Sequence, residues 1–257
     1  VLHLLREPRA VGTFLASGLS VTCNWGVYIW AANSGHLLET SIGYYLCPLC
    51  NIAFGLLVFK ERLTPMQKVA TVLAATGVAY FMIVHGGDVW IALALALSFS
   101  AYGAVKKKGG YPALPGMALE SLLTGLLGGA ALTVGALAPW IWQVVPATPD
   151  PFAVASPTLD FALLVGCGLL TAIPLLLYSA AANRISMTVL GFIQYVSPTI
   201  ALVLAVAFFG EQFTPAHAVC FALIWCGIAA VGVESWLAKR REARAEQREG
   251  DPRESAA

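Results

Sequence analysis

The chain has 257 residues, of which 58% are hydrophobic and only 11% are charged. Soluble domains carry about 25% charged residues, and a soluble protein of this length would need polar helix faces that most of these apolar segments lack. The sequence also lacks the short alternating segments of a membrane β-barrel. The composition therefore indicates an all-α integral membrane protein.

Long apolar segments follow one another along the chain, and a helix needs about 20 such residues to cross a bilayer. The segment at residues 89–105 is the shortest of them. We predict eight transmembrane helices at residues 11–33, 38–59, 66–85, 89–105, 117–142, 159–183, 187–209 and 215–237.

All fifteen Lys and Arg residues fall in the leader, in alternate connections and in the tail. Basic loops stay in the cytoplasm during insertion, so this pattern predicts a bacterial inner-membrane protein with both termini cytoplasmic. We expect the charged tail at residues 239–257 to be disordered. The basic residues are Arg6, Arg9, Lys60, Arg62, Lys68, Lys106, Lys107, Lys108, Arg184, Lys239, Arg240, Arg241, Arg244, Arg248 and Arg253.

The chain also matches itself without gaps at an offset of 150 residues. The offset spans five helices, an odd number, so the two copies have opposite orientation, as in many secondary transporters. The matching pairs include Tyr28 with Tyr178, Asn33 with Asn183, Tyr45 with Tyr195, Pro48 with Pro198, Glu61 with Glu211, Thr64 with Thr214, Pro65 with Pro215 and Gly77 with Gly227.

The repeat divides the chain unequally. Residues 1–88 hold three helices of the first copy, whereas residues 89–238 hold all five helices of the second. We therefore expect two further helices to precede Val1 in a ten-helix protein.

Prolines stand near the middle of two equivalent segments. Pro48 and Pro198 each remove a backbone hydrogen bond and favour a kink, and paired interrupted helices point to the binding cavity of a transporter. We interpret both residues as hinges, with helix packing alone as the alternative.

Polar and aromatic side chains inside apolar segments should face the bundle interior or a wet cavity. Tyr28 and Tyr178 could instead belong to interfacial belts. Glu120 could bind a cationic group, carry a proton or lie at the cytoplasmic surface. The candidate substrate-binding residues are Asn24, Trp25, Tyr28, Asn33, Tyr45, Asn51, Glu120, Tyr178, Gln194 and Tyr195.

Other polar residues have structural explanations. Glu61 and Glu211 each precede a Thr-Pro pair that predicts an N-cap and a first helical residue, so we interpret both acids as structural. Cys47 and Cys50 have the spacing of a redox motif. Because they lie inside an apolar segment, we interpret them as small apolar residues that pack between helices. We expect no cofactor and no metal.

One stretch resembles a known family. Residues 24–31, followed by Asn33, Gly35, His36, Glu39, Gly43, Tyr44 and Pro48, resemble the RarD-type permeases of the EamA group in the drug/metabolite transporter superfamily. The resemblance implies ten helices in two inverted five-helix repeats and carrier-type transport of small organic molecules. The subgroup is named for a chloramphenicol-sensitivity phenotype. Cys47 stands where the subgroup is expected to have Asn.

We therefore expect a secondary transporter, and not an enzyme, that moves a metabolite or drug by alternating access. Its expected partners are a small-molecule substrate and the lipid bilayer, but no nucleic acid. The small-residue face at Gly125 and Gly129 suits packing within the monomer or in a homodimer. The alternatives are a truncated, inactive transporter fragment and a non-transporting membrane scaffold.

Overall fold

A computed structural model describes residues 4, 6–137, 157–209 and 213–249. Within these ranges all regular structure is helical, which confirms the predicted all-α class. The helices are α1 (Pro8–Asn33), α2 (Leu37–Leu57), α3 (Pro65–His85), α4 (Val89–Gly109), α5 (Ala113–Leu137), α6 (Pro157–Ala182), α7 (Met187–Gln194), α8 (Val196–Phe209) and α9 (Pro215–Glu249).

In the described part of the chain, seven stretches of helix are long and apolar enough to cross a membrane. Helices α7 and α8 together supply one of them, between Met187 and Leu204. Helix α1 is 26 residues long but more polar, because it carries Asn24, Asn33 and two serines. The chain is a multi-pass membrane protein whose helices follow the predicted segments. The predicted end of the fifth segment, residues 138–142, lies outside the described residues.

Helices α3 and α9 both begin at the predicted proline. Thr64 Oγ1 accepts a hydrogen bond from the Gln67 N–H at 3.2 Å, and the Thr64 N–H donates to Gln67 Oε1 at 3.0 Å. In the second copy His217 replaces the glutamine, and the Thr214 N–H donates to its Nδ1 at 3.4 Å. The two copies therefore keep a reciprocal capping arrangement although the partner side chain differs.

The two paired prolines lie in different helical surroundings. Pro48 lies inside the continuous helix α2, whereas the chain turns at Tyr195 between α7 and α8, shortly before Pro198. Proline has no N–H, so the carbonyl four residues earlier, that of Tyr44 or Gln194, loses its helical partner. Equivalent positions in the two copies thus both expose a backbone acceptor.

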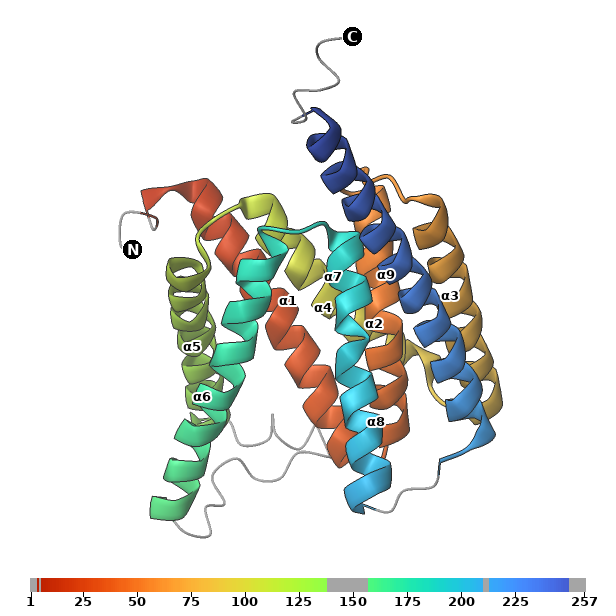
Figure 1. The fold of residues 1–257 in the computed structure, drawn as a ribbon. Helices are drawn as coiled ribbons and strands as arrows, with labels where there is room; N and C mark the ends of the chain where they lie inside the picture. Colours follow the sequence, from red (N-terminus) through yellow and green to blue (C-terminus); the bar gives the residue numbers. More distant parts are fainter. Residues whose placement is uncertain (1–3, 5, 138–156, 210–212, 250–257) are drawn as a thin grey trace. The chain divides into compact units, whose positions relative to one another are not determined.

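Figure 1 shows the helices coloured along the sequence. Two compact units make up the chain, and each combines residues of both predicted repeats. The first unit comprises Val1–Glu61 and Gly86–Pro198, and the second comprises Arg62–His85 and Thr199–Ala257. Within the first unit, α2 packs against α4 and α7, while α1 packs against α4 and α5. Within the second unit, α3 packs along α9.

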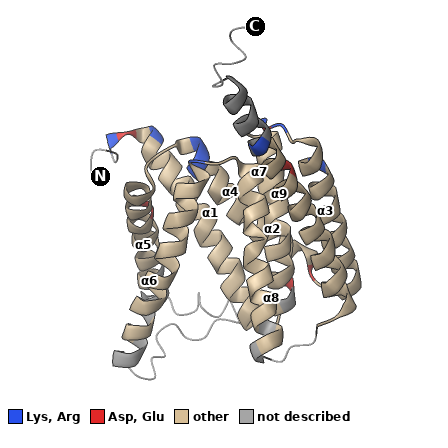
Figure 2. Ribbon diagram, viewed as in Figure 1, with Lys and Arg blue, Asp and Glu red and all other residues tan. Residues whose placement is uncertain are grey.

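Basic residues gather at one end of the first unit's helices (Figure 2). Lys107 contacts both Glu61 and the Ile185 carbonyl, so the connections after α2 and α6 meet the end of α4 here. We call this region the basic end of the first unit. It comprises Arg6, Arg9, Lys60, Lys106, Lys107, Lys108 and Arg184.

The predicted disordered tail begins as helix instead. Helix α9 continues past Lys239 to Glu249, because Ala, Glu, Arg and Gln in this segment are strong helix formers. Arg240 also stacks over the Trp236 ring at 3.7 Å, one turn away on the same helix. Residues 250–257 lie outside the described part.

Twin residues make reciprocal contacts in the second unit. A Cβ added at Gly77 would lie 3.2 Å from the Cys220 carbonyl oxygen, and one added at Gly227 would lie 2.9 Å from the Ala70 Cα. The repeat pairs Gly77 with Gly227 and Ala70 with Cys220. Helices α3 and α9 therefore meet through the same small-residue face, as expected for inverted copies packed about a two-fold axis.

We predict that Gly227→Ala destabilises the protein by about 1–3 kcal/mol through overpacking against backbone atoms. Gly77→Ala should cost less, because its new Cβ meets Cys220 at a longer distance. Gly232→Ala is the matched control, since nothing lies within 4 Å of its Cβ position. Thermal unfolding of the purified protein in detergent measures all three, and equal midpoints for Gly227→Ala and Gly232→Ala would contradict the packing described.

Candidate substrate cavity

A cavity of about 130 Å³ lies among α1, α2, α4, α7 and the start of α8 in the first unit. Its wall includes Asn24, Gln194 and Pro198 of the predicted site and hinge. Helices of both predicted repeats contribute to it. The lining residues are Asn24, Thr40, Gly43, Tyr44, Cys47, Leu95, Phe99, Gln194, Ser197 and Pro198.

Amide side chains tie this wall together. The Asn24 amide donates to the Leu95 carbonyl at 2.8 Å and to Ser98 Oγ at 3.0 Å, which joins α1 to α4. The Asn51 amide donates to Gln194 Oε1, which joins α2 to α7. These bonds satisfy polar groups that would be costly to bury alone, and they hold the cavity's amides in fixed orientations.

Cys47 connects the same network to α4. Gln194 Nε2 lies 3.5 Å from Cys47 Sγ, and Ser100 Oγ donates to the Cys47 carbonyl at 3.2 Å. The asparagine expected in the subgroup is absent here, so a thiol occupies a place where an amide would offer both a donor and an acceptor. Cys50 is likewise a free thiol.

Aromatic rings stand in two groups beside the cavity. Tyr28 meets Tyr44 edge-on at 6.1 Å, and Trp25 meets Tyr28 at 6.0 Å. On the other side, Tyr178 packs against Phe99 at 5.0 Å. Tyr44 and Phe99 therefore line the cavity, and Tyr28 and Tyr178 contact these rings without being among the lining residues.

Five other predicted site residues lie away from the lining. Asn51 and Tyr195 are fully buried, and Tyr45 is nearly so. Asn33 is exposed at the end of α1, where its amide donates to the Ile29 carbonyl at 2.8 Å. Trp25 lines a separate groove with residues of α5 and α6.

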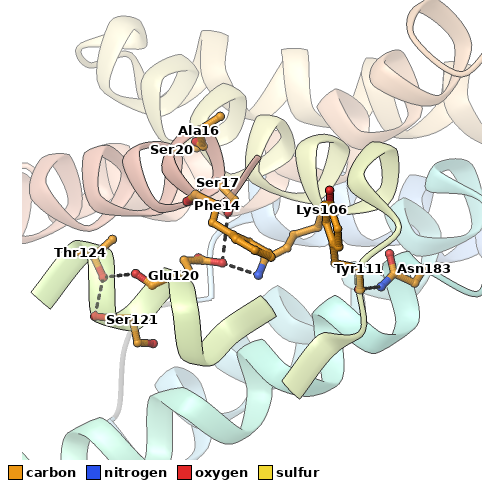
Figure 3. Close-up of polar contacts among 10 residues, drawn as sticks. All are labelled: Phe14, Ala16, Ser17, Ser20, Lys106, Tyr111, Glu120, Ser121, Thr124 and Asn183. Atoms are coloured by element: carbon orange, nitrogen blue, oxygen red, sulfur yellow. Dashed lines mark hydrogen bonds and ion pairs between the residues drawn. The ribbon is translucent and has the colours of Figure 1, made fainter. Parts of the chain in front are cut away.

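Glu120 forms a buried ion pair with Lys106 (Figure 3), and neither residue lines the cavity. Its carboxylate pairs with Lys106 Nζ and accepts a hydrogen bond from Ser17 Oγ at 3.2 Å. The two charged side chains are only 7% and 6% exposed. Lys106 also lies over the Tyr102 ring at 5.4 Å. The pair therefore joins α1, α4 and α5 near the basic end.

This pair corrects the prediction that Lys106 belongs to a basic connection. Helix α4 runs to Gly109, so the lysine lies on a helix and its side chain turns inward to meet Glu120. Pairing offsets the cost of burying either charge alone. The sequence held a signal, since an unpaired acid inside an apolar segment requires a cationic partner nearby.

Sequence reasoning also missed lining residues on α2 and on α4. Thr40, Gly43 and Cys47 recur at intervals of three and four along α2, and Leu95 and Phe99 do so along α4, which places each set on one helix face. Extending the face of Tyr44 along its helix would have found the first set. The second set is apolar and carries no comparable signal.

We predict that Lys106→Met destabilises the protein by about 3–5 kcal/mol, because it leaves the Glu120 charge buried and unpaired. Adding Glu120→Gln should recover much of this loss, since no isolated charge then remains. Thermal unfolding of both single variants and the double variant forms the cycle. If the stability losses of the two single variants simply add in the double variant, the two side chains do not interact.

Comparison with known proteins places the chain among transporters. The pattern of the EamA-like transporter family matches residues 3–83 and 86–233. An uncharacterized transporter of Pseudomonas aeruginosa is 37% identical over 239 residues, which are 93% of this chain and 77% of the relative. The RarD protein of Escherichia coli is 35% identical over 241 residues, 94% of this chain and 78% of the relative. These matches confirm the resemblance to RarD-type permeases.

A solved crystal structure has a similar fold. It shares 22% sequence identity and superposes with a TM-score of 0.62, covering 90% of this chain and 78% of the other. At this identity the likeness shows the fold alone.

Proposed function

Because the chain belongs to the EamA-like transporter family and is a membrane transporter related to the RarD proteins, we propose that it is a secondary carrier for a small, uncharged organic molecule. The observation that supports this proposal is the cavity of the first unit. Among the described residues that line it, there are amide, hydroxyl, thiol and aromatic groups but no Lys, Arg, Asp or Glu.

The neutral lining of the cavity favours an uncharged substrate. An ionised group moved from water into such a cavity would lose its hydration without gaining a counter-ion, at a cost of several kcal/mol. The buried charges of Lys106 and Glu120 pair with each other and do not line the cavity. An uncharged substrate avoids this cost.

The lining groups suit an aromatic or amide-bearing molecule. Tyr44 and Phe99 offer ring faces, whereas Gln194 and Ser197 offer donors and acceptors. Pockets for small organic molecules commonly combine apolar walls with a few such polar groups. The carbonyls freed by Pro48 and Pro198 would add acceptors for a substrate N–H or O–H.

The two predicted repeats give the carrier its mechanism. In inverted-repeat transporters one half rocks against the other around a site near the bilayer midplane. Here Pro48 and Pro198 lie next to the cavity and would serve as the hinges. The carrier would reside in the bacterial inner membrane with both termini in the cytoplasm, as the alternate basic connections indicate.

Uptake into liposomes that contain the purified protein tests the substrate class. The test compounds are phenylacetamide, phenethylamine and phenylacetate, which share a ring but differ in charge. Phenicol drugs are also included, because one relative is named Chloramphenicol-sensitive protein RarD. We expect uncharged compounds to enter at least ~10-fold faster than charged ones. Faster uptake of a charged member, or no uptake of any compound above protein-free liposomes, would count against the proposal.

We predict that Tyr44→Ala lowers uptake of the best compound about ten-fold, because losing one aromatic contact costs about 1.5 kcal/mol. Tyr80→Ala is the matched control: both tyrosines are partly exposed, at 51% and 39%, but Tyr80 does not line the cavity. Equal uptake by the two variants would remove Tyr44 from the site.

A further inference from the structure

Glu61 caps a helix that belongs to the other repeat. Its Oε1 accepts a hydrogen bond from the Met187 N–H at 2.8 Å, and its Oε2 accepts bonds from the Thr188 N–H at 3.0 Å and the Thr188 hydroxyl at 2.8 Å. Ser186 Oγ accepts the next N–H, that of Val189, at 3.1 Å. A carboxylate here also complements the positive end of the α7 dipole.

Lys107 joins this contact from α4. Its Nζ donates to the Ile185 carbonyl and lies 3.8 Å from Glu61 Oε1. It also lies over the Phe59 ring at 5.5 Å. The cation and the carboxylate together connect the end of α2 with the end of α4 and the start of α7. We call Glu61, Lys107, Ile185, Met187 and Thr188 the Glu61 cluster.

The Glu61 carboxylate stays charged in this cluster. Burial alone would raise its pKa, but the bonds from Thr188 and Met187 and the nearby Lys107 charge hold the pKa below its usual value of 4.5. A lowered pKa in the folded state means that the stabilisation is present above about pH 4.5 and is lost only as the pH falls through the lowered value. The cluster is therefore intact at neutral pH.

The position of the cluster relates it to the cavity. Helices α2, α4 and α7 wall the cavity, and the cluster joins the same three helices at the basic end. Cys47 lies in the cavity wall. About 15 Å of helix separates it from Leu57, where α2 ends. The cavity could open toward the basic end only if these helices separated there, which would break the bonds to Glu61.

We propose that Glu61 is a gating residue that closes the cytoplasmic entrance of the cavity while its carboxylate caps α7. The proposal rests on the alternating-access function proposed above. In this role Glu61 acts on α7 in addition to its structural place before the Thr-Pro turn. Gly55 supports the closed contact, because a Cβ at this position would lie only 2.7 Å from Glu61 Oε2.

Labelling of the Cys47 thiol by disulfide exchange tests the gate without any substrate. Cys47 would be the single cysteine left after the other five are replaced, and a membrane-impermeant methanethiosulfonate is applied to inside-out and right-side-out vesicles. We expect Glu61→Gln to raise the labelling rate in inside-out vesicles on the order of ten-fold, because charge-assisted bonds to α7 are lost. Arg62→Gln, which removes a neighbouring exposed charge, should leave the rate unchanged.

An unchanged rate in a folded Glu61→Gln protein, or an equal rise from both sides, would overturn the gate. Gly55→Ala offers a second variant that displaces the carboxylate but keeps every charge, and it should also raise labelling from the inside. Normal transport with unchanged labelling would leave the carrier function standing without the gate. Altered labelling without transport of any compound would leave the gate standing without the carrier function.

Discussion

The predicted inverted repeat is the constraint on which our description of the rest of the structure depends. Two copies of one helix pattern can pack about a two-fold axis only if the shared face is small enough for close approach. Gly77 against Cys220 and Gly227 against Ala70 meet this condition in α3 and α9. The same predicted repeat pairs Pro48 with Pro198. Pro198 lines the cavity, and Pro48 follows the lining residue Cys47.

Burial of polar groups in an apolar chain imposes the second constraint. Each buried donor, acceptor or charge needs a partner, because lipid offers none. Lys106 and Glu120 satisfy one another, Asn51 bonds to Gln194, and Glu61 is held by the start of α7. Lys106, Glu120 and Glu61 are thereby engaged outside the cavity, and the described residues of its lining carry no charge.

The fold could be read from the sequence to a large extent. The length of the apolar segments predicted the positions of the helices, and the Thr-Pro pairs predicted the first residues of α3 and α9. Both signals could be used because they are local in the sequence. The partner of Glu120 could not be read, since pairing with Lys106 depends on how α4 and α5 approach each other. Likewise, Tyr178 was predicted to bind substrate, whereas the structure shows it packed against Phe99, which lines the cavity. Such side-chain contacts depend on how the helices pack.

The two copies are predicted to have opposite orientation in the membrane. Single cysteines at Arg62 and Phe213, in equivalent turns of the two copies, report it directly when intact cells are treated with a membrane-impermeant maleimide. The account predicts that the cysteine at 213 reacts from outside and that the cysteine at 62 reacts only after the cells are opened. Reaction of both from the same side would contradict it.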